Sequence, residues 1–203
     1  IVTGLASALS GDLIVSGTQK GYTDFGGITA NNSDSEIFMA SLDGNSGSLN
    51  WVTTAGGIGE DEGGPVGVDS MGTIWQAGTT DGTFSANAKS HQAVSQADTI
   101  IVKWSSQGIV QDVIGLSSPA TKINLPHDLI ITQTDDVVVS GVFLGSLDAG
   151  NQNTLTDKGN GDGYVVKILK SGASSWATSA GGSSGLERVY SIAETSNGDF
   201  IAG

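Results

Sequence analysis

VGVDSMGTIWQAGTT, residues 66–80, indicates the architecture of this chain because the sequence repeats it. Related stretches are LASALSGDLIVSGTQ at 5–19, LIITQTDDVVVSGVF at 129–143 and IAETSNGDFIAG at 192–203. A second block recurs in the same rhythm, as SEIFMASL at 35–42, ADTIIVKW at 97–104 and GDGYVVKI at 161–168. Copies about 62 residues apart are typical of architectures that stack one supersecondary unit.

Each copy contains four short apolar runs separated by Gly, Ser, Asn and Asp, the residues that form turns. In the third run even the residues between the inward positions are apolar (Met39, Ile101 and Val165), which indicates strands buried on both faces. A sandwich would show one polar face, and a β-solenoid, the second choice, would need shorter coils. The pattern predicts an all-β fold: a β-propeller segment of about three and a half four-stranded antiparallel blades, from a propeller of about six to eight.

We expect residues 1–203 to form one propeller segment. Its blade repeats should cover about 5–56, 65–116 and 127–180, with the start of a further blade at 189–203. Because only closure removes the exposed strand edges of a propeller, we expect further repeats on both sides in the natural protein.

Four stretches also carry a resemblance: DTIIVK at 98–103, DGYVVK at 162–167, GGIGED at 56–61 and GGSSG at 181–185. They resemble the repeat of bacterial seven-bladed β-propellers. The first copy departs from that repeat with Glu36 in place of Asp and Ser41 in place of Lys, and the second copy lacks the double glycine. The resemblance implies a scaffold and carries no catalytic residues.

Composition narrows the classes of partner. The chain has 203 residues, eight Lys and Arg, no cysteine and a net charge of −13, which argues against nucleic acid and anionic membrane surfaces. No apolar run approaches the roughly 20 residues that cross a bilayer, so no membrane insertion is expected. An acidic surface rich in Gly, Ser, Thr and Asn is typical of extracellular or cell-surface proteins. Asn31, in the sequon Asn31-Asn32-Ser33, is the predicted glycosylation site.

The links between second and third strands are long in every copy (about 18–35, 79–97 and 142–161), whereas the first-to-second and third-to-fourth links are tight. We therefore predict the binding surface on the face with the long loops. The candidate binding residues are Glu60, Asp61, Glu62, Asp81 and His91. Calcium is the cofactor that such carboxylates suit, and a solvated loop is the competing interpretation.

Two repeated columns have structural interpretations. Glu36, Asp98 and Asp162 precede the third strand of each copy, and we expect each to accept backbone hydrogen bonds at a turn rather than form a ring of ligands. Trp51 and Trp176 share a column with Val113 between them, and we expect both indoles to pack between blades.

No catalytic set is visible: the sequence has no Gly-x-Ser-x-Gly elbow and no thiol, and His91 and His127 lack a third metal ligand. The sequence favours a non-enzymatic propeller scaffold of a secreted or cell-surface protein that mediates protein–protein or ligand interaction, adhesion or assembly. Its partner would be a protein or glycan at the long-loop face, or another copy of itself. The alternatives are a propeller enzyme, hydrolase or lyase, with Glu60 and Asp61 as acid and base, and a carbohydrate-binding propeller.

Overall fold

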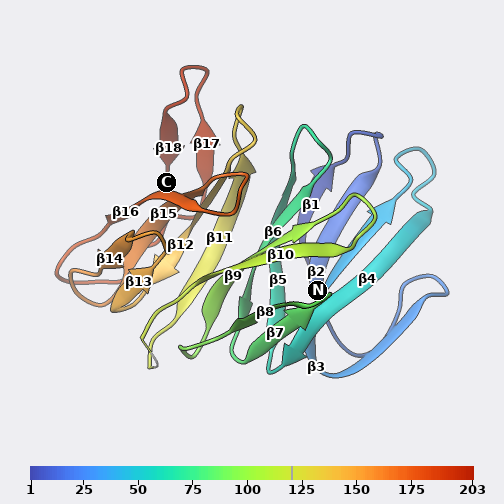
Figure 1. Cartoon of the computed structure of the whole chain (residues 1–203), viewed down its shortest axis with the longest axis horizontal. Coiled ribbons are helices and arrows are strands. Elements are labelled where there is room, and N and C mark those ends of the chain that lie inside the picture. The colour runs from blue at the N-terminus through green and yellow to red at the C-terminus, as the bar shows by residue number, and fades with distance from the viewer. Residues whose placement is uncertain (120) are drawn as a thin grey trace.

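A computed structural model describes residues 1–119 and 121–203 as antiparallel β-sheets, with no helix in these two ranges. Three four-stranded meanders follow one another along the chain (Figure 1). The first sheet comprises β1 (Val2–Ser7), β2 (Leu13–Asp24), β3 (Thr29–Leu42) and β4 (Leu49–Ile58). The second comprises β5 (Asp61–Val68), β6 (Ile74–Thr80), β9 (Asp98–Trp104) and β10 (Val110–Leu116). The third comprises β11 (Asn124–Ile131), β12 (Val137–Phe143), β15 (Asp162–Ile168) and β16 (Ser174–Ala180).

A further pair, β17 (Ile192–Glu194) and β18 (Phe200–Ala202), forms a two-stranded ladder beside the third sheet. The turns between first and second strands are alike in all four units. Gly11, Gly72 and Gly198 have positive φ, and Asp135 adopts φ 63° at the same place in the third sheet. An aspartate therefore fits a turn position that usually requires glycine.

The apolar core lies between the sheets. Ile100 and Ile101 are neighbours in β9 and both are fully buried, because consecutive side chains of a strand point to opposite faces. Ile100 packs with Ile37 and Met39 of the first sheet, whereas Ile101 packs with Val139 and other residues of the third. The prediction of an all-β fold is therefore confirmed, and β9 is buried on both faces, as expected for the third strand of a copy.

Two of the three long links contain short hairpins that the sequence did not reveal, whereas the link predicted at 18–35 is formed mostly by the ends of β2 and β3. β7 (Thr83–Ala86) and β8 (Lys89–Gln92) form one, and β13 (Ser146–Asp148) and β14 (Thr154–Thr156) form the other. β7 pairs with the edge of β4 in the first sheet, and Asp148 exchanges backbone hydrogen bonds with Ser117, just after β10. The β7–β8 hairpin thus extends the first sheet, whereas β13–β14 forms a separate two-stranded sheet with one bridge to the residue that follows β10. Phe84 and Leu147, both fully buried, anchor the two hairpins.

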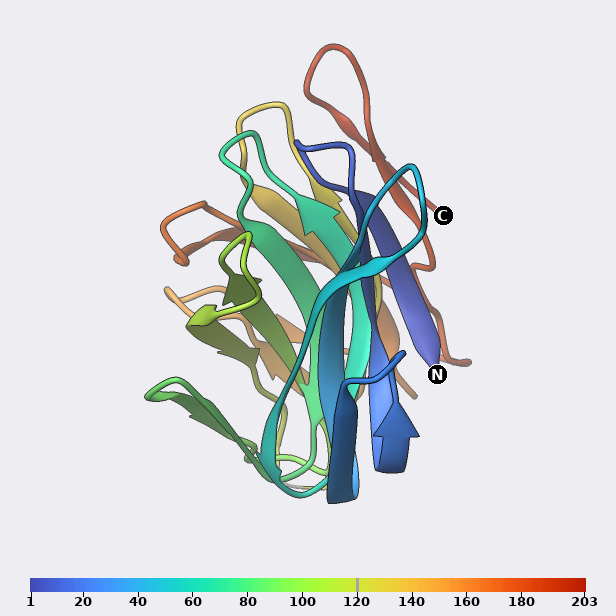
Figure 2. The same ribbon diagram turned by 90° about the vertical axis from the view of Figure 1, so that its right-hand side faces the viewer.

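Short turns and long links lie on opposite sides of the molecule. The turns that follow β1, β5 and β11 are at the top of Figure 1 and Figure 2, and the β7–β8 hairpin is at the bottom of both. No helix in the described ranges is long and apolar enough to cross a lipid bilayer.

Candidate functional site

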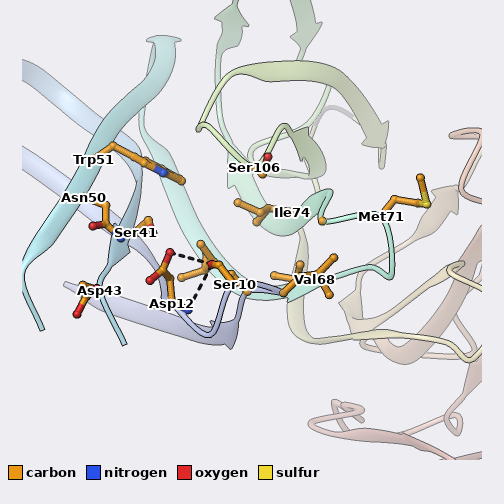
Figure 3. A pocket seen from close by; sticks show the side chains of 14 residues that line it. Ser10, Asp12, Ser41, Asp43, Asn50, Trp51, Val68, Met71, Ile74 and Ser106 are labelled. Carbon is orange, nitrogen blue, oxygen red and sulfur yellow. Dashed lines mark hydrogen bonds between the residues drawn. The ribbon is translucent and has the colours of Figure 1, made fainter. Parts of the chain in front are cut away.

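A pocket of about 500 Å³ opens between the first and second sheets, on the side of the short turns (Figure 3). The sequence predicted the binding surface on the face with the long links. The pocket lies on the opposite side. Its apolar wall consists mainly of Ile14, Trp51, Val68 and Ile74. Its polar groups come from Ser10, Asp12, Ser41, Asp43, Asn50 and Ser106.

Ser41 makes room for this pocket. The ladders place Ser41, Lys103 and Lys167 at one position of the three sheets, opposite Ile14, Trp75 and Val138. In the second sheet the Nζ atom of Lys103 lies 4.9 Å from the ring centre of Trp75 and donates to the carbonyl oxygen of Lys170, 3.3 Å away in the third sheet. Because Ser41 and Ile14 are much smaller than Lys103 and Trp75, the corresponding space in the first sheet stays open.

The turns at the two junctions also differ, and the difference again leaves the first junction more open than the second. At the second junction Asp135 accepts hydrogen bonds from the backbone N–H and the hydroxyl of Ser70, at 2.9 and 2.7 Å. These bonds join the turns of the second and third sheets and lower the pKa of Asp135. At the first junction Gly72 occupies the position of Asp135 and faces a methyl group of Leu9. The first junction therefore lacks this link between turns.

Trp51 forms one side of the pocket from β4. Its half-buried indole extends toward the second sheet in Figure 3, and its edge packs against Gly108, where a β-carbon would come within 2.6 Å of the ring. The ladder pairs Trp51 with Ser41, and Asp112 with Lys103. Asp112, rather than the aligned Val113, is therefore the counterpart of Trp51, because the chain from Ser41 to Trp51 is one residue longer than that from Lys103 to Asp112.

The polar side chains of the pocket are held by local hydrogen bonds. Asp12 accepts from the Ser10 hydroxyl at 2.8 Å, and Asn50 donates its Nδ2 to the Ser41 hydroxyl at 3.3 Å. Asp43 Oδ1 accepts from the backbone and hydroxyl of Ser46, which lower the pKa of this carboxyl.

One oxygen of each of the two carboxylates stays free. Asp12 Oδ1 and Asp43 Oδ2 accept no hydrogen bond from any residue in the described ranges. Each can therefore accept a hydrogen bond from a molecule in the pocket.

On the opposite side of the molecule, the structure separates the acids that the sequence grouped. Glu60 forms an ion pair with Lys20 at 2.6 Å and accepts from the backbone N–H of Ser35 at 3.1 Å. The bond to Lys20, followed by that to Ser35, lowers the pKa of Glu60 to about 2. Asp81 accepts from the backbone N–H of Glu60 at 2.7 Å, and Glu62 is exposed.

Asp61 is fully buried beside the carboxyl group of Glu36, a residue that the sequence pattern predicted at a turn. Asp61 Oδ2 accepts from the backbone N–H of Gly57 at 2.8 Å, while its Oδ1 has no partner in the described residues. The side chains of Glu36 and Asp61 both lie against Gly56, so closely that a β-carbon at this position would collide with them. Burial raises the pKa of Asp61 to about 6. Burial and the neighbouring charges of Asp61 and Asp34 raise that of Glu36 to about 7.

His91 lies in β8, which extends the first sheet, and its ring lies against Gly115 of β10 in the second sheet. Its Nε2 is 3.0 Å from the buried carboxylate of Asp98, which also accepts hydrogen bonds from Ser95, Ser117 and the backbone of Val94. Burial alone would raise the pKa of Asp98, but these bonds hold it at about 2. Asp98 therefore has the structural role that the sequence suggested, and His91 is its partner.

Two ligand predictions remain predictions. In the described ranges no group of three or more His, Asp or Glu side chains is arranged to hold a metal ion, and calcium binding remains a prediction from the sequence. Asn31 is exposed on β3, beside Tyr22 in the ladder, which is compatible with a glycan.

The pocket residues were missed as a site, although one signal pointed to them. Ser41 was visible as a departure from the lysine of the other copies, and the space that it leaves is the pocket. The polar residues themselves gave no signal, because serine, aspartate and asparagine are common in turns.

Comparison with known proteins adds no family. No protein family matches the sequence, and no curated protein matches it. Among solved structures, the chain is similar to a protein of unknown function from Bacteroides caccae, solved at 1.35 Å, with 13% identity and a TM-score of 0.41. The match covers 99% of this chain and 69% of that one.

Proposed function

We propose that this chain is a β-propeller segment that acts as a non-enzymatic binding module of a secreted or cell-surface protein. The order of strands supports the propeller, because each sheet is a meander of four consecutive repeat strands and adjacent sheets pack face to face. A structure of the natural full-length protein tests it: successive sheets should be related by a rotation of about 50–60°, as about six to eight blades require.

The observation that carries the binding function is the pocket at the first junction. A repeated scaffold gains a specific site where one copy departs from the others, because residues shared by all copies serve to build each unit. Here Ser41 replaces the lysine of the other two sheets, and the departure opens a pocket beside an indole and two carboxylates. The proposed function is therefore the binding of a ligand between the turns of two sheets.

The environment of the acids supports binding rather than turnover. Glu60 and Asp61 were the acid and base of the enzyme alternative, yet Glu60 is held by Lys20 and Asp61 is sealed from solvent. His91, another candidate base, is paired with Asp98. A general acid or base must reach the substrate, whereas Asp61 and the His91 Nε2 face other residues of the protein and the exposed Glu60 is paired with Lys20.

Tryptophan fluorescence tests the binding function. Trp75 and Trp104 are fully buried and Trp176 packs on Phe200, so Trp51 is the indole placed to respond to a ligand. The full-length protein is titrated with neutral sugars, short peptides and tetramethylammonium, and the recovered compounds are checked for chemical change.

We expect one class to change the fluorescence saturably and to be recovered intact. The response should disappear in the Ser41→Lys variant, which carries the residue of the other two sheets. Conversion of a bound compound would refute the non-enzymatic function, and a panel without any saturable response would refute the binding module.

A further inference from the structure

We infer that the pocket between the first and second sheets binds a saccharide, with one neutral pyranose ring held against Trp51. This inference rests on the proposed binding function and names its ligand class. A pyranose presents an apolar face of C–H groups and a rim of hydroxyls, so its site needs an aromatic surface with hydrogen-bonding groups around it.

Trp51 supplies the aromatic surface. Its indole is half-buried and fixed along one edge by Gly108, so little side-chain freedom is lost when a ring stacks on it. Val68 and Ile74 of the second sheet continue the apolar wall. A volume of about 500 Å³ is within the range of pockets that bind small molecules.

The polar groups match a set of hydroxyls. Asp12 and Asp43 each keep one oxygen free to accept a hydrogen bond, and their other oxygens are fixed by serines. Asn50 offers both an acceptor and a donor, as carboxamides do. Sugar hydroxyls donate and accept at once, so this mixture of acceptors and donors complements them.

The lining of the pocket disfavours two competing ligand classes, anions and organic cations. The described residues that line the pocket include two aspartates and no Lys, Arg or His, which disfavours phosphates and carboxylates. Organic cations are typically bound in cages of several aromatic rings, whereas Trp51 is the one aromatic residue in this lining. A neutral polyol fits both observations.

The experiment measures binding of defined sugars to the full-length protein by isothermal titration calorimetry. The probes are the methyl glycosides of glucose, galactose and mannose, together with cellobiose and lactose. We expect at least one to bind, and the Trp51→Ala variant to weaken that binding about tenfold or more, as loss of a central aromatic contact does.

Two substitutions should block the pocket, because each introduces the residue that another sheet has at the same position. Ser41→Lys introduces the residue of positions 103 and 167, and Gly72→Asp introduces that of Asp135, which tolerates the same positive φ. Both should abolish sugar binding without lowering the melting temperature by more than a few degrees. Trp176→Ala is the matched control, because Trp176 pairs with Lys167 as Trp51 pairs with Ser41. It should leave sugar binding unchanged.

The outcomes separate this inference from the proposed function. Binding of tetramethylammonium or a peptide, but of no sugar, would refute the saccharide and leave the binding module standing. Sugar binding that survives in folded Trp51→Ala and Ser41→Lys variants would overturn this pocket as the site. Equal loss of sugar binding in Trp176→Ala would also overturn it.

Discussion

Glu36 of the first sheet and Asp61 of the second bring their carboxyl groups to the same glycine, Gly56. One oxygen of Asp61 is buried and has no hydrogen-bond partner among the described residues, and Glu36 lies beside it. Burial raises the pKa of both groups, Glu36 to about 7 and Asp61 to about 6. The pair therefore keeps protons in the folded protein at a pH where an unfolded chain would have released them.

The stability of the protein should fall as pH rises from about 5 to about 7.5. Over this window the folded state binds more protons at Glu36 and Asp61 than the unfolded state does, so release of these protons favours unfolding. The lowered pKa values of Glu60 and Asp98, both about 2, act at lower pH and do not oppose the trend. Guanidinium unfolding at several pH values measures the slope.

In the Glu36→Gln variant this slope should become flatter, because glutamine does not ionise. Glu62→Gln is the control: it removes one negative charge from an exposed position of β5 and should keep the slope of the parent protein. An unchanged slope in Glu36→Gln would show that the pair is not its source.

Replacement of Asp98 by alanine should destabilise the protein by about 3–5 kcal/mol, since it removes the buried carboxylate that several hydrogen-bond donors share. Asp98 is fully buried and accepts from His91, Ser95 and Ser117. Asp112→Ala, at an exposed carboxylate 3.8 Å from Lys89, should cost about 0–1 kcal/mol. Denaturant midpoints of the two variants test the difference, and equal losses would contradict it.

Phe84→Ala should free the β7–β8 hairpin from the first sheet. Phe84 is fully buried and pairs with Gly57 in the ladder, and a truncation of this kind typically costs about 3–5 kcal/mol. Hydrogen exchange should accelerate at Gly56–Ile58, next to the hairpin, more than in β15. Uniform acceleration through all three sheets would instead indicate global unfolding.

Tyr164 and Thr99 should couple the second and third sheets energetically. Their hydroxyls lie 3.2 Å apart, and both residues are fully buried. A double-mutant cycle with Tyr164→Phe and Thr99→Val should give a coupling of about 1 kcal/mol. Additive effects of the two substitutions would refute a hydrogen bond of this strength.

The repeat made the strands predictable, but not the hairpins. In β6 and β9, apolar residues and turn glycines recur at the same offsets in each copy, so local pattern and structure agree. TFSA in β7 and KSHQ in β8 carry no such alternation. They become strands because the edge of β4, distant in sequence, offers them partners. Pairing with a distant edge leaves no periodic signal in a segment this short.

The candidate site shows a similar limit. Charge density drew attention to Glu60–Glu62, yet adjacent residues of a strand face opposite ways, so Asp61 is buried while Glu62 is exposed. The pocket depends on the size of side chains across a junction, and that information appears only when copies are compared in register. The departure at Ser41 was visible in the sequence, whereas the pairing of Asp112, rather than Val113, with Lys103 was not.

The pairing of β7 with β4 has a consequence for the nascent chain. On the ribosome the first sheet has all its own strands once Ile58 has emerged, but its outer edge stays open until the hairpin ending at Gln92 follows. An open strand edge invites pairing with other chains. The speed of translation between Ile58 and Gln92 therefore determines how long the nascent chain is prone to aggregation. A pause in this interval would lengthen that time.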